Sequence, residues 1–335
     1  VAFVGSAEAP VNPEVMEGYA AMGALATDKG LRGLDGLGDD QDPDHRRACR
    51  PFSDNCGFTI AESSQMAVLF DDELAMQLGA TMYGAATDVF VNADGHKKSI
   101  SGPGVGNYIT MAKAVAAARS IVGEEGVRRG GIVQAHGTGT PQNRTSESEI
   151  LSRTAEAFGI QDWPVAAIKC YLGHSLGSAS GDQFNATLGI WGHGIIPGID
   201  TIEQLAEDVR RDRLDFALRH RALEPEEQQY AIINSKGFGG NNASATLLSP
   251  SVTTRMLQAR YSDQEWTAWQ RANEDVQARQ QAYDDDMVLG TREPVYKFDH
   301  GVLLDGDVEL GAGRMLVGGK VVDLDFESPY PDMQI

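Results

Sequence analysis

The chain has few cysteines, and their number and spacing do not suit disulfide bonds. Cys49, Cys56 and Cys170 are odd in number, and no two of them have the CxxC spacing of a zinc site or a redox pair. This pattern argues against a disulfide framework and against a structural metal. Because secreted proteins of this size usually carry paired cysteines, a reducing, cytoplasmic setting is predicted.

Positive charge is also scarce. The chain has 28 Lys and Arg against 48 Asp and Glu, a formal net charge of -20. Nucleic-acid binding is not expected, because neutralising a phosphate backbone requires clustered cations. Long apolar runs are missing too: the uncharged stretch from Gln183 to Ile199 is shorter than the roughly 20 apolar residues that a membrane helix needs, and His193 interrupts it. No membrane span is predicted.

Glycine, by contrast, is plentiful. The sequence has 38 glycines in 335 residues, which is above the usual share of about 7 per cent. Apolar runs at Val1–Ala9, 131–135 and Tyr230–Ser235 predict strands, the first of them buried, and residues 109–122 have helical spacing. Strands alternating with helices predict a layered α/β fold, in which loops at strand ends carry the chemistry.

Three further segments have readable local signals. The acidic, glycine-rich stretch 30–44 lacks the spacing of a calcium loop, so it is predicted to be a flexible surface loop without a metal. Ser146 and Glu149 fit a capping box for a helix that Gly159 ends. Beyond Val252, a polar helix over 263–285 and short alternating segments predict an appended tail.

Three motifs bring together residues that can do chemistry. HGTGTP places His136 directly after an apolar strand, although a histidine in such a turn is as often purely structural. KCYLGHSLG places Lys169 five residues before His174, and NSKGFGGNN puts Phe238 in a glycine turn between two strands. Their order along the chain makes coincidence a poor explanation.

Taken in order, HGTGTP, KxxxGHSLG and NSxGFGGxN closely resemble the signature set of the β-ketoacyl-acyl carrier protein synthases, which belong to the thiolase superfamily. The resemblance covers roughly residues 1 to 250. It implies a five-layer αβαβα thiolase fold that is incomplete at the N-terminus. Residues 1–130 would be the end of the N-terminal thiolase half, residues 131–250 the C-terminal half, and residues 251–335 an appended helix and β tail.

The resemblance also implies a reaction and its residues. The family joins an acyl thioester to malonyl-acyl carrier protein by decarboxylative Claisen condensation, in fatty-acid or polyketide biosynthesis. By resemblance, the neutral imidazoles of His136 and His174 donate hydrogen bonds to the thioester carbonyl. Lys169 would be a buried cation held by the carboxylate of Glu147. No metal and no cofactor are expected, since the substrates are carried on the phosphopantetheine of acyl carrier protein or of coenzyme A.

Other roles follow from the same resemblance. Phe238, with Gly237 and Gly239, matches the gate and oxyanion hole, whereas Thr138 and Thr140 match threonines that contact the pantetheine arm. The implied partners are acyl carrier protein and a second copy of the chain in a homodimer.

The main departure is the nucleophile. The family's cysteine lies in a TAC motif at a helix N-terminus, and no such motif occurs in this sequence. The nucleophile is therefore expected upstream, in a missing N-terminal segment or in a separate subunit. Lys236 stands where phenylalanine is common and Arg144 where aspartate is usual. The cation at 236 leaves the preferred acyl chain length open.

Two alternatives compete with a condensing enzyme. One is a non-catalytic, synthase-like subunit that pairs with an active ketosynthase, although such subunits often lose the histidines that this chain retains. The other is a degradative thiolase, which would need a GHP motif and a second active cysteine near its C-terminus. Ser175 follows His174 here, and no cysteine occurs after Cys170.

Overall fold

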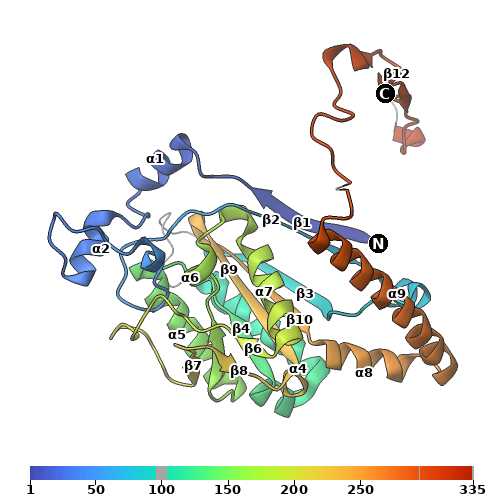
Figure 1. The fold of residues 1–335 in the computed structure, drawn as a ribbon. Helices are drawn as coiled ribbons and strands as arrows, with labels where there is room; N and C mark the ends of the chain where they lie inside the picture. The colour runs from blue at the N-terminus through green and yellow to red at the C-terminus, as the bar shows by residue number, and fades with distance from the viewer. Residues whose placement is uncertain (96–103, 294, 334–335) are drawn as a thin grey trace. The chain divides into compact units, whose positions relative to one another are not determined.

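The computed structural model describes residues 1–95, 104–293 and 295–333. Two compact units divide the chain, Val1–Val276 and Gln277–Ile335. Every residue predicted to belong to the site lies in the first unit, whose layers are drawn in Figure 1.

A six-stranded sheet forms the centre of the first unit. Its order is β3-β10-β9-β4-β5-β7. The strands β9, β4, β5 and β7 run parallel, while β10 is antiparallel to both of its neighbours, β9 and β3. The bounds of the six strands are β3 (Ala85–Ala93), β4 (Gly131–Gln134), β5 (Trp163–Ala166), β7 (Leu214–Phe216), β9 (Tyr230–Gly237) and β10 (Asn241–Leu248).

Helices cover both faces of this sheet (Figure 1). Helices α4 (Val105–Arg129) and α5 (Pro141–Phe158) pack on one face, and α7 (Ala179–His193) packs on the other. Side chains along β9 alternate between the two cores: Ile232 joins the α4 side, whereas Ala231 and Ile233 join the α7 side. This alternation is the period-2 pattern of a strand buried on both faces.

A two-stranded ribbon lies beyond α7. Strand β1 (Ala2–Glu8) pairs antiparallel with β2 (Ser63–Leu69), and β2 contacts α7. The succession of helices α4 and α5, central sheet, α7 and ribbon gives four successive layers of the predicted αβαβα arrangement. The predicted strand at the N-terminus is confirmed, but its predicted burial is wrong: Phe3 is 75% exposed. Among the described residues β1 has only β2 to pair with, so its side chains are left uncovered.

Helix boundaries correct several predictions. Helix α4 extends beyond 109–122 at both ends and kinks at Gly123, where φ is 75°. Helix α5 begins at Pro141 and not at Ser146, because proline is well suited to the first helical turn. The capping box is therefore wrong, and Ser146 is buried inside the helix. The predicted end is confirmed: Gly159 caps α5 in the left-handed conformation.

The stretch 30–44 is not entirely a loop. Helix α2 (Asp28–Asp35) occupies its first part, because Thr27 caps the helix and Leu31 is buried beneath it. The remaining elements of the first unit are short: α1 (Pro13–Ala21), α3 (Asp72–Leu78), α6 (Lys169–Leu172), β6 (Ile195–Ile196), β8 (Arg221–Ala222) and α8 (Pro250–Arg260).

The predicted tail helix and short strands are confirmed. Helix α9 (Asp263–Leu289) includes residues of both units, and the second unit contains an antiparallel sheet of β11 (Val308–Leu310), β12 (Arg314–Val317) and β13 (Lys320–Asp323).

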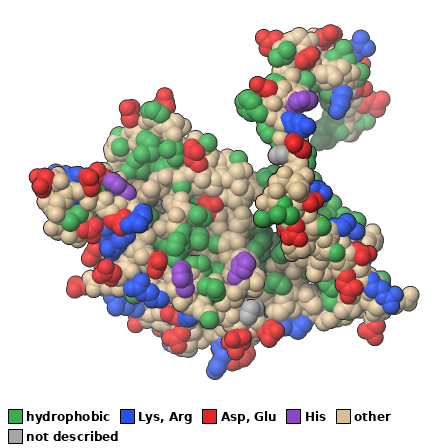
Figure 2. Space-filling view, in the orientation of Figure 1, with side chains coloured by type: hydrophobic (Ala, Val, Ile, Leu, Met, Phe, Trp, Pro, Cys, Tyr) green, Lys and Arg blue, Asp and Glu red, His purple; other side chains and the backbone are tan. Residues whose placement is uncertain are grey.

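Hydrophobic side chains are exposed on α1 of the first unit, as Figure 2 shows. Among the described helices, none is both long enough and apolar enough to cross a membrane.

Candidate functional site

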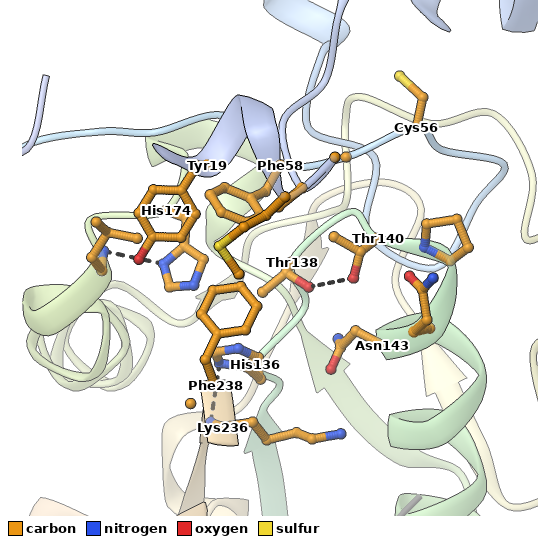
Figure 3. Close-up of a pocket in the computed structure, with 18 of the residues that line it drawn as sticks. Tyr19, Cys56, Phe58, His136, Thr138, Thr140, Asn143, His174, Lys236 and Phe238 are labelled. Carbon is orange, nitrogen blue, oxygen red and sulfur yellow. Dashed lines mark hydrogen bonds between the residues drawn. The ribbon is translucent and has the colours of Figure 1, made fainter. Parts of the chain in front are cut away.

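The predicted motifs converge on one pocket of about 350 Å³ (Figure 3). His136 and His174 lie between a mainly apolar wall and a polar wall. The apolar wall includes Tyr19, Met22, Phe58, Leu176 and Phe238, and the polar wall includes Thr138, Thr140, Gln142, Asn143 and Lys236.

His136 lies in the pocket because it follows directly after the end of β4. The chain turns there through Gly137 and Gly139, whose φ angles of 50° and 60° lie in the left-handed region that favours glycine. The backbone N–H groups of His136 and Gly137 donate to the carboxylate of Glu147, at 2.6 and 2.9 Å. The position of His136 is therefore set by α5, which carries Glu147, as well as by its own strand.

His174 follows the short helix α6. Gly173 makes the turn with φ 75°, and a Cβ at this glycine would lie 2.9 Å from the carbonyl oxygen of Thr59. The backbone of His174 then pairs with the extended segment opposite. Its N–H donates to Thr59 O at 2.7 Å, and its carbonyl accepts from the N–H of Ala61 at 3.1 Å.

Both imidazoles are held in the same way. The backbone N–H of Lys236 donates to Nδ1 of His136 at 3.3 Å, and that of Leu176 donates to Nδ1 of His174 at 3.2 Å. Since Nδ1 accepts in each ring, the proton of the neutral imidazole is on Nε2. The two rings stand edge to face (Figure 3). Their centroids are 5.3 Å apart.

The surroundings keep both imidazoles neutral. Burial and the nearby ammonium of Lys169 lower the pKa of each histidine well below its usual value. For His136, the second histidine and Lys236 lower the pKa further. Each ring therefore offers one N–H donor at neutral pH and carries no charge.

Lys169 lies behind the pocket and is only 2% exposed. Burial lowers its pKa to about 8, with partial opposition from Glu147, Cys49 and Asp182. The predicted salt bridge to Glu147 does not form, because the Lys169 ammonium has no hydrogen-bond partner among the described residues, and Glu147 acts on it only through its charge. The carboxylate of Glu147 is instead occupied by neutral N–H donors.

Those donors make Glu147 the centre of a buried polar network. Besides the two backbone N–H groups at the His136 turn, its carboxylate accepts from the side-chain amides of Asn143, at 2.9 Å, and Asn234, at 2.7 Å. Asn234 also accepts from Asn107 of α4 at 2.7 Å. The network therefore joins β9, α4 and α5 around the turn that carries His136.

Phe238, the predicted gate residue, lies on the apolar wall of the pocket. Phe238 lies in the tight turn between β9 and β10, where Gly239 has φ 79°. Its ring is 38% exposed and lies 5.8 Å from the ring of Tyr19. On the polar wall, the hydroxyls of Thr138 and Thr140 are 3.1 Å apart. Of the predicted site residues, Lys169 and Glu147 are buried behind the pocket surface, Gly239 is exposed in the turn and does not line the pocket, and the others line it.

The three cysteines differ in their surroundings. Cys49 and Cys170 are buried, and burial raises the pKa of each thiol to about 12. Neither forms a thiolate at neutral pH, which agrees with their exclusion as nucleophiles. Cys56 is half-buried and lines the pocket, a position that the sequence did not indicate (Figure 3).

Several lining residues were missed from the sequence. Tyr19 comes from α1, Met22 from the turn after it and Leu176 from the turn after His174, and none of these side chains belongs to a chemical motif. Phe58 could have been found, since the RPF and GF pattern around it resembles the same family. No cluster of three His, Cys, Asp or Glu side chains suited to a metal occurs in the part of the chain that the structure describes.

Comparison with known proteins agrees with this arrangement. Residues 83–202 match the family model described as Beta-ketoacyl synthase, C-terminal domain. The chain is 51% identical over 319 residues to the β-ketoacyl-[acyl-carrier-protein] synthase FabY of Pseudomonas aeruginosa, covering 95% of this chain and 50% of that protein. It is 28% identical over 242 residues to 3-oxoacyl-[acyl-carrier-protein] synthase 2 of Vibrio cholerae, covering 72% of this chain and 53% of the relative.

Solved structures give the same result. The crystal structure of the noncanonical ketosynthase FabY from P. aeruginosa matches with a TM-score of 0.85 and 49% identity, covering 99% of this chain and 52% of that one. A type II polyketide ketosynthase in complex with its acyl-carrier protein, AntDE:AntF, matches with a TM-score of 0.57 at 22% identity, over 74% of this chain and 55% of that one. The second likeness concerns the fold alone.

The chain thus spans about half the length of the relatives it matches. The predicted thiolase-type α/β fold is confirmed by the structural likeness. Together with the convergence of the three motifs on one pocket, these matches show that the chain belongs to the β-ketoacyl synthase family, with the C-terminal domain of that family at residues 83–202.

Proposed function

We propose that the protein containing this chain is a β-ketoacyl-acyl carrier protein synthase, which condenses an acyl thioester with malonyl-acyl carrier protein in fatty-acid or polyketide biosynthesis. The observation that carries the proposal is the pair of neutral imidazoles. His136 and His174 line the same pocket as Phe238, and both have Nδ1 occupied by a backbone N–H. The similarity to a FabY synthase supports the same reaction.

The reaction needs what this pair supplies. When a malonyl thioester loses carbon dioxide, negative charge develops on the thioester oxygen, and two preorganised N–H donors stabilise it. One donor of this kind is typically worth about 2.7 to 4 kcal/mol in the transition state. Neutral rings are required because each must donate from Nε2 while its Nδ1 remains an acceptor. Lys169 acts behind them, since its buried charge opposes protonation of both rings.

The remaining roles extend this mechanism. The turn of Gly237, Phe238 and Gly239 would gate the acyl group and provide an oxyanion-hole N–H, and Thr138 and Thr140 would contact the pantetheine arm. The acyl group would be held by a cysteine thiolate outside this chain. The catalytic C-terminal half would include residues 131–250 and also β3 and α4, since the C-terminal family model matches from residue 83, with the tail from 251 as an addition.

The partners of the reaction follow from its substrates. Acyl carrier protein would deliver the malonyl group, and we propose a homodimer in the cytoplasm that uses no metal or other cofactor. One related structure is described as a ketosynthase with its acyl-carrier protein.

The test uses the intact protein that contains this sequence. Release of labelled carbon dioxide from malonyl-acyl carrier protein is measured beside transfer of an acyl group to the enzyme. His174→Ala should abolish release of carbon dioxide and leave acyl transfer largely intact. His193→Ala is the matched control, because His193 is exposed at the end of α7.

Normal decarboxylation by His174→Ala would contradict the role given to this histidine. A wild-type protein that neither decarboxylates nor accepts an acyl group, yet copurifies with an active ketosynthase, would instead indicate the non-catalytic subunit.

A further inference from the structure

Lys236 stands out among the residues that line the pocket. It is a cation in β9, only 6% exposed, on the polar wall beside His136. Its side chain is anchored, because Nζ donates to the hydroxyl of Ser146 in α5 at 3.0 Å. The ammonium is therefore held at a fixed place on α5, while the backbone N of the same residue contacts His136, as Figure 3 shows.

The same residue also acts through its backbone. The N–H of Lys236 donates to Nδ1 of His136 at 3.3 Å. A proton on Nδ1 would place two donors against each other and break this bond. The backbone of Lys236 thus selects the tautomer of His136, while its side chain adds a positive charge that opposes the imidazolium.

We infer that Lys236 is a positioning residue that keeps His136 neutral and in its Nε2–H form. It has no such effect on His174, whose neutrality depends on other groups. This role of Lys236 goes beyond the proposed reaction, although its importance for catalysis rests on the proposed function. Charged groups face His136 from several elements. Lys169 of α6 and His174 in the turn after it disfavour protonation along with Lys236. Glu147 of α5 is the negative group, and it accepts from the backbone N–H of His136.

The two histidines differ in a way that makes the inference testable. The pKa of His174 is lowered by burial and then by Lys169, whereas that of His136 is lowered by burial, Lys169, His174 and also Lys236. Removing the charge at 236 should therefore affect one ring of the pair. His174 then serves as a control inside the same molecule.

The experiment is a pH titration of the chain labelled with ¹⁵N-histidine and followed by NMR. His136→Gln and His174→Gln assign the two rings. Lys236→Met removes the charge but keeps the aliphatic stem and the backbone N–H, and Lys236→Arg keeps the charge. Thermal unfolding of each variant checks that the fold is retained.

In Lys236→Met the imidazolium signal of His136 should appear at a higher pH than in the wild type, with His174 unchanged. Lys236→Arg should behave as the wild type. An unchanged His136 in Lys236→Met would overturn the inference, and so would an equal shift in both variants, because packing and not charge would then be responsible.

This readout needs no turnover, so it separates the inference from the proposed reaction. In the active intact protein, Lys236→Met should also move the acidic limb of the pH–rate profile to higher pH. If the NMR shift appears but no condensation is detected, the proposed function fails and the electrostatic role of Lys236 stands.

Discussion

Replacing Lys169 with methionine should stabilise the protein, although Lys169 belongs to the proposed catalytic group. The side chain is 2% exposed and its ammonium has no hydrogen-bond partner among the described residues. Burial lowers its pKa from 10.5 to about 8. Because one pKa unit corresponds to about 1.36 kcal/mol, keeping this charge in the folded state costs on the order of 3 kcal/mol. Methionine keeps the apolar stem and removes the charge.

The gain should depend on pH in a defined direction. Below pH 8 the folded and the unfolded states both carry the proton, so the full cost is present. Between about pH 8 and 10.5 the folded state releases the proton while the unfolded state retains it, and the wild type gains stability as pH rises. The advantage of Lys169→Met should therefore be largest at pH 7 and shrink toward pH 10.

The assay is urea unfolding of the wild type and Lys169→Met at several pH values. Lys29→Met is the control, because Lys29 is exposed on α2 and its replacement should change the free energy of unfolding by less than about 0.5 kcal/mol. A Lys169→Met protein that is less stable than the wild type at pH 7 would refute the reasoning. It would mean that the ammonium has a compensating partner in the folded protein.

Two further predictions concern the backbone around the histidines. Gly173→Ala should destabilise the fold by about 1 kcal/mol or more and weaken any reaction that depends on His174, because a Cβ would meet Thr59 O at a positive φ; unchanged thermal unfolding would contradict this. Glu147→Gln should cost about 3 kcal/mol, since an amide cannot accept from all four N–H donors, and a loss below 0.5 kcal/mol in urea unfolding would show that the network can rearrange.

Local rules were sufficient for part of the fold. The spacing of apolar residues predicted correctly which segments are strands and that 109–122 is helical, because repeats of 2.0 and 3.6 residues can be read from the sequence alone. Boundaries were less certain. Helix α5 began at Pro141 and not at the expected Ser146, since two local signals competed and the proline at the first turn prevailed.

Burial was the property that the sequence predicted least well. Strand β1 has the apolar composition of a buried strand, yet Phe3 is 75% exposed. Composition records which side chains favour an apolar environment, but the segments that cover a strand are supplied by the rest of the molecule. The same reason explains Tyr19, which reaches the pocket through the placement of α1 and belongs to no motif.

The sequence by itself identified the family and the two histidines, because its three motifs resemble the family's signature set, and it showed the glycine turns beside them, because turn-forming glycines are a local property. Only the tertiary structure decided how these groups act. The backbone N–H of Lys236 donates to His136, although the two residues are 100 positions apart in the chain. The carboxylate of Glu147 accepts from neutral N–H donors and not from Lys169. Proton positions and ion pairs depend on distances of a few ångströms between remote segments, and packing sets those distances.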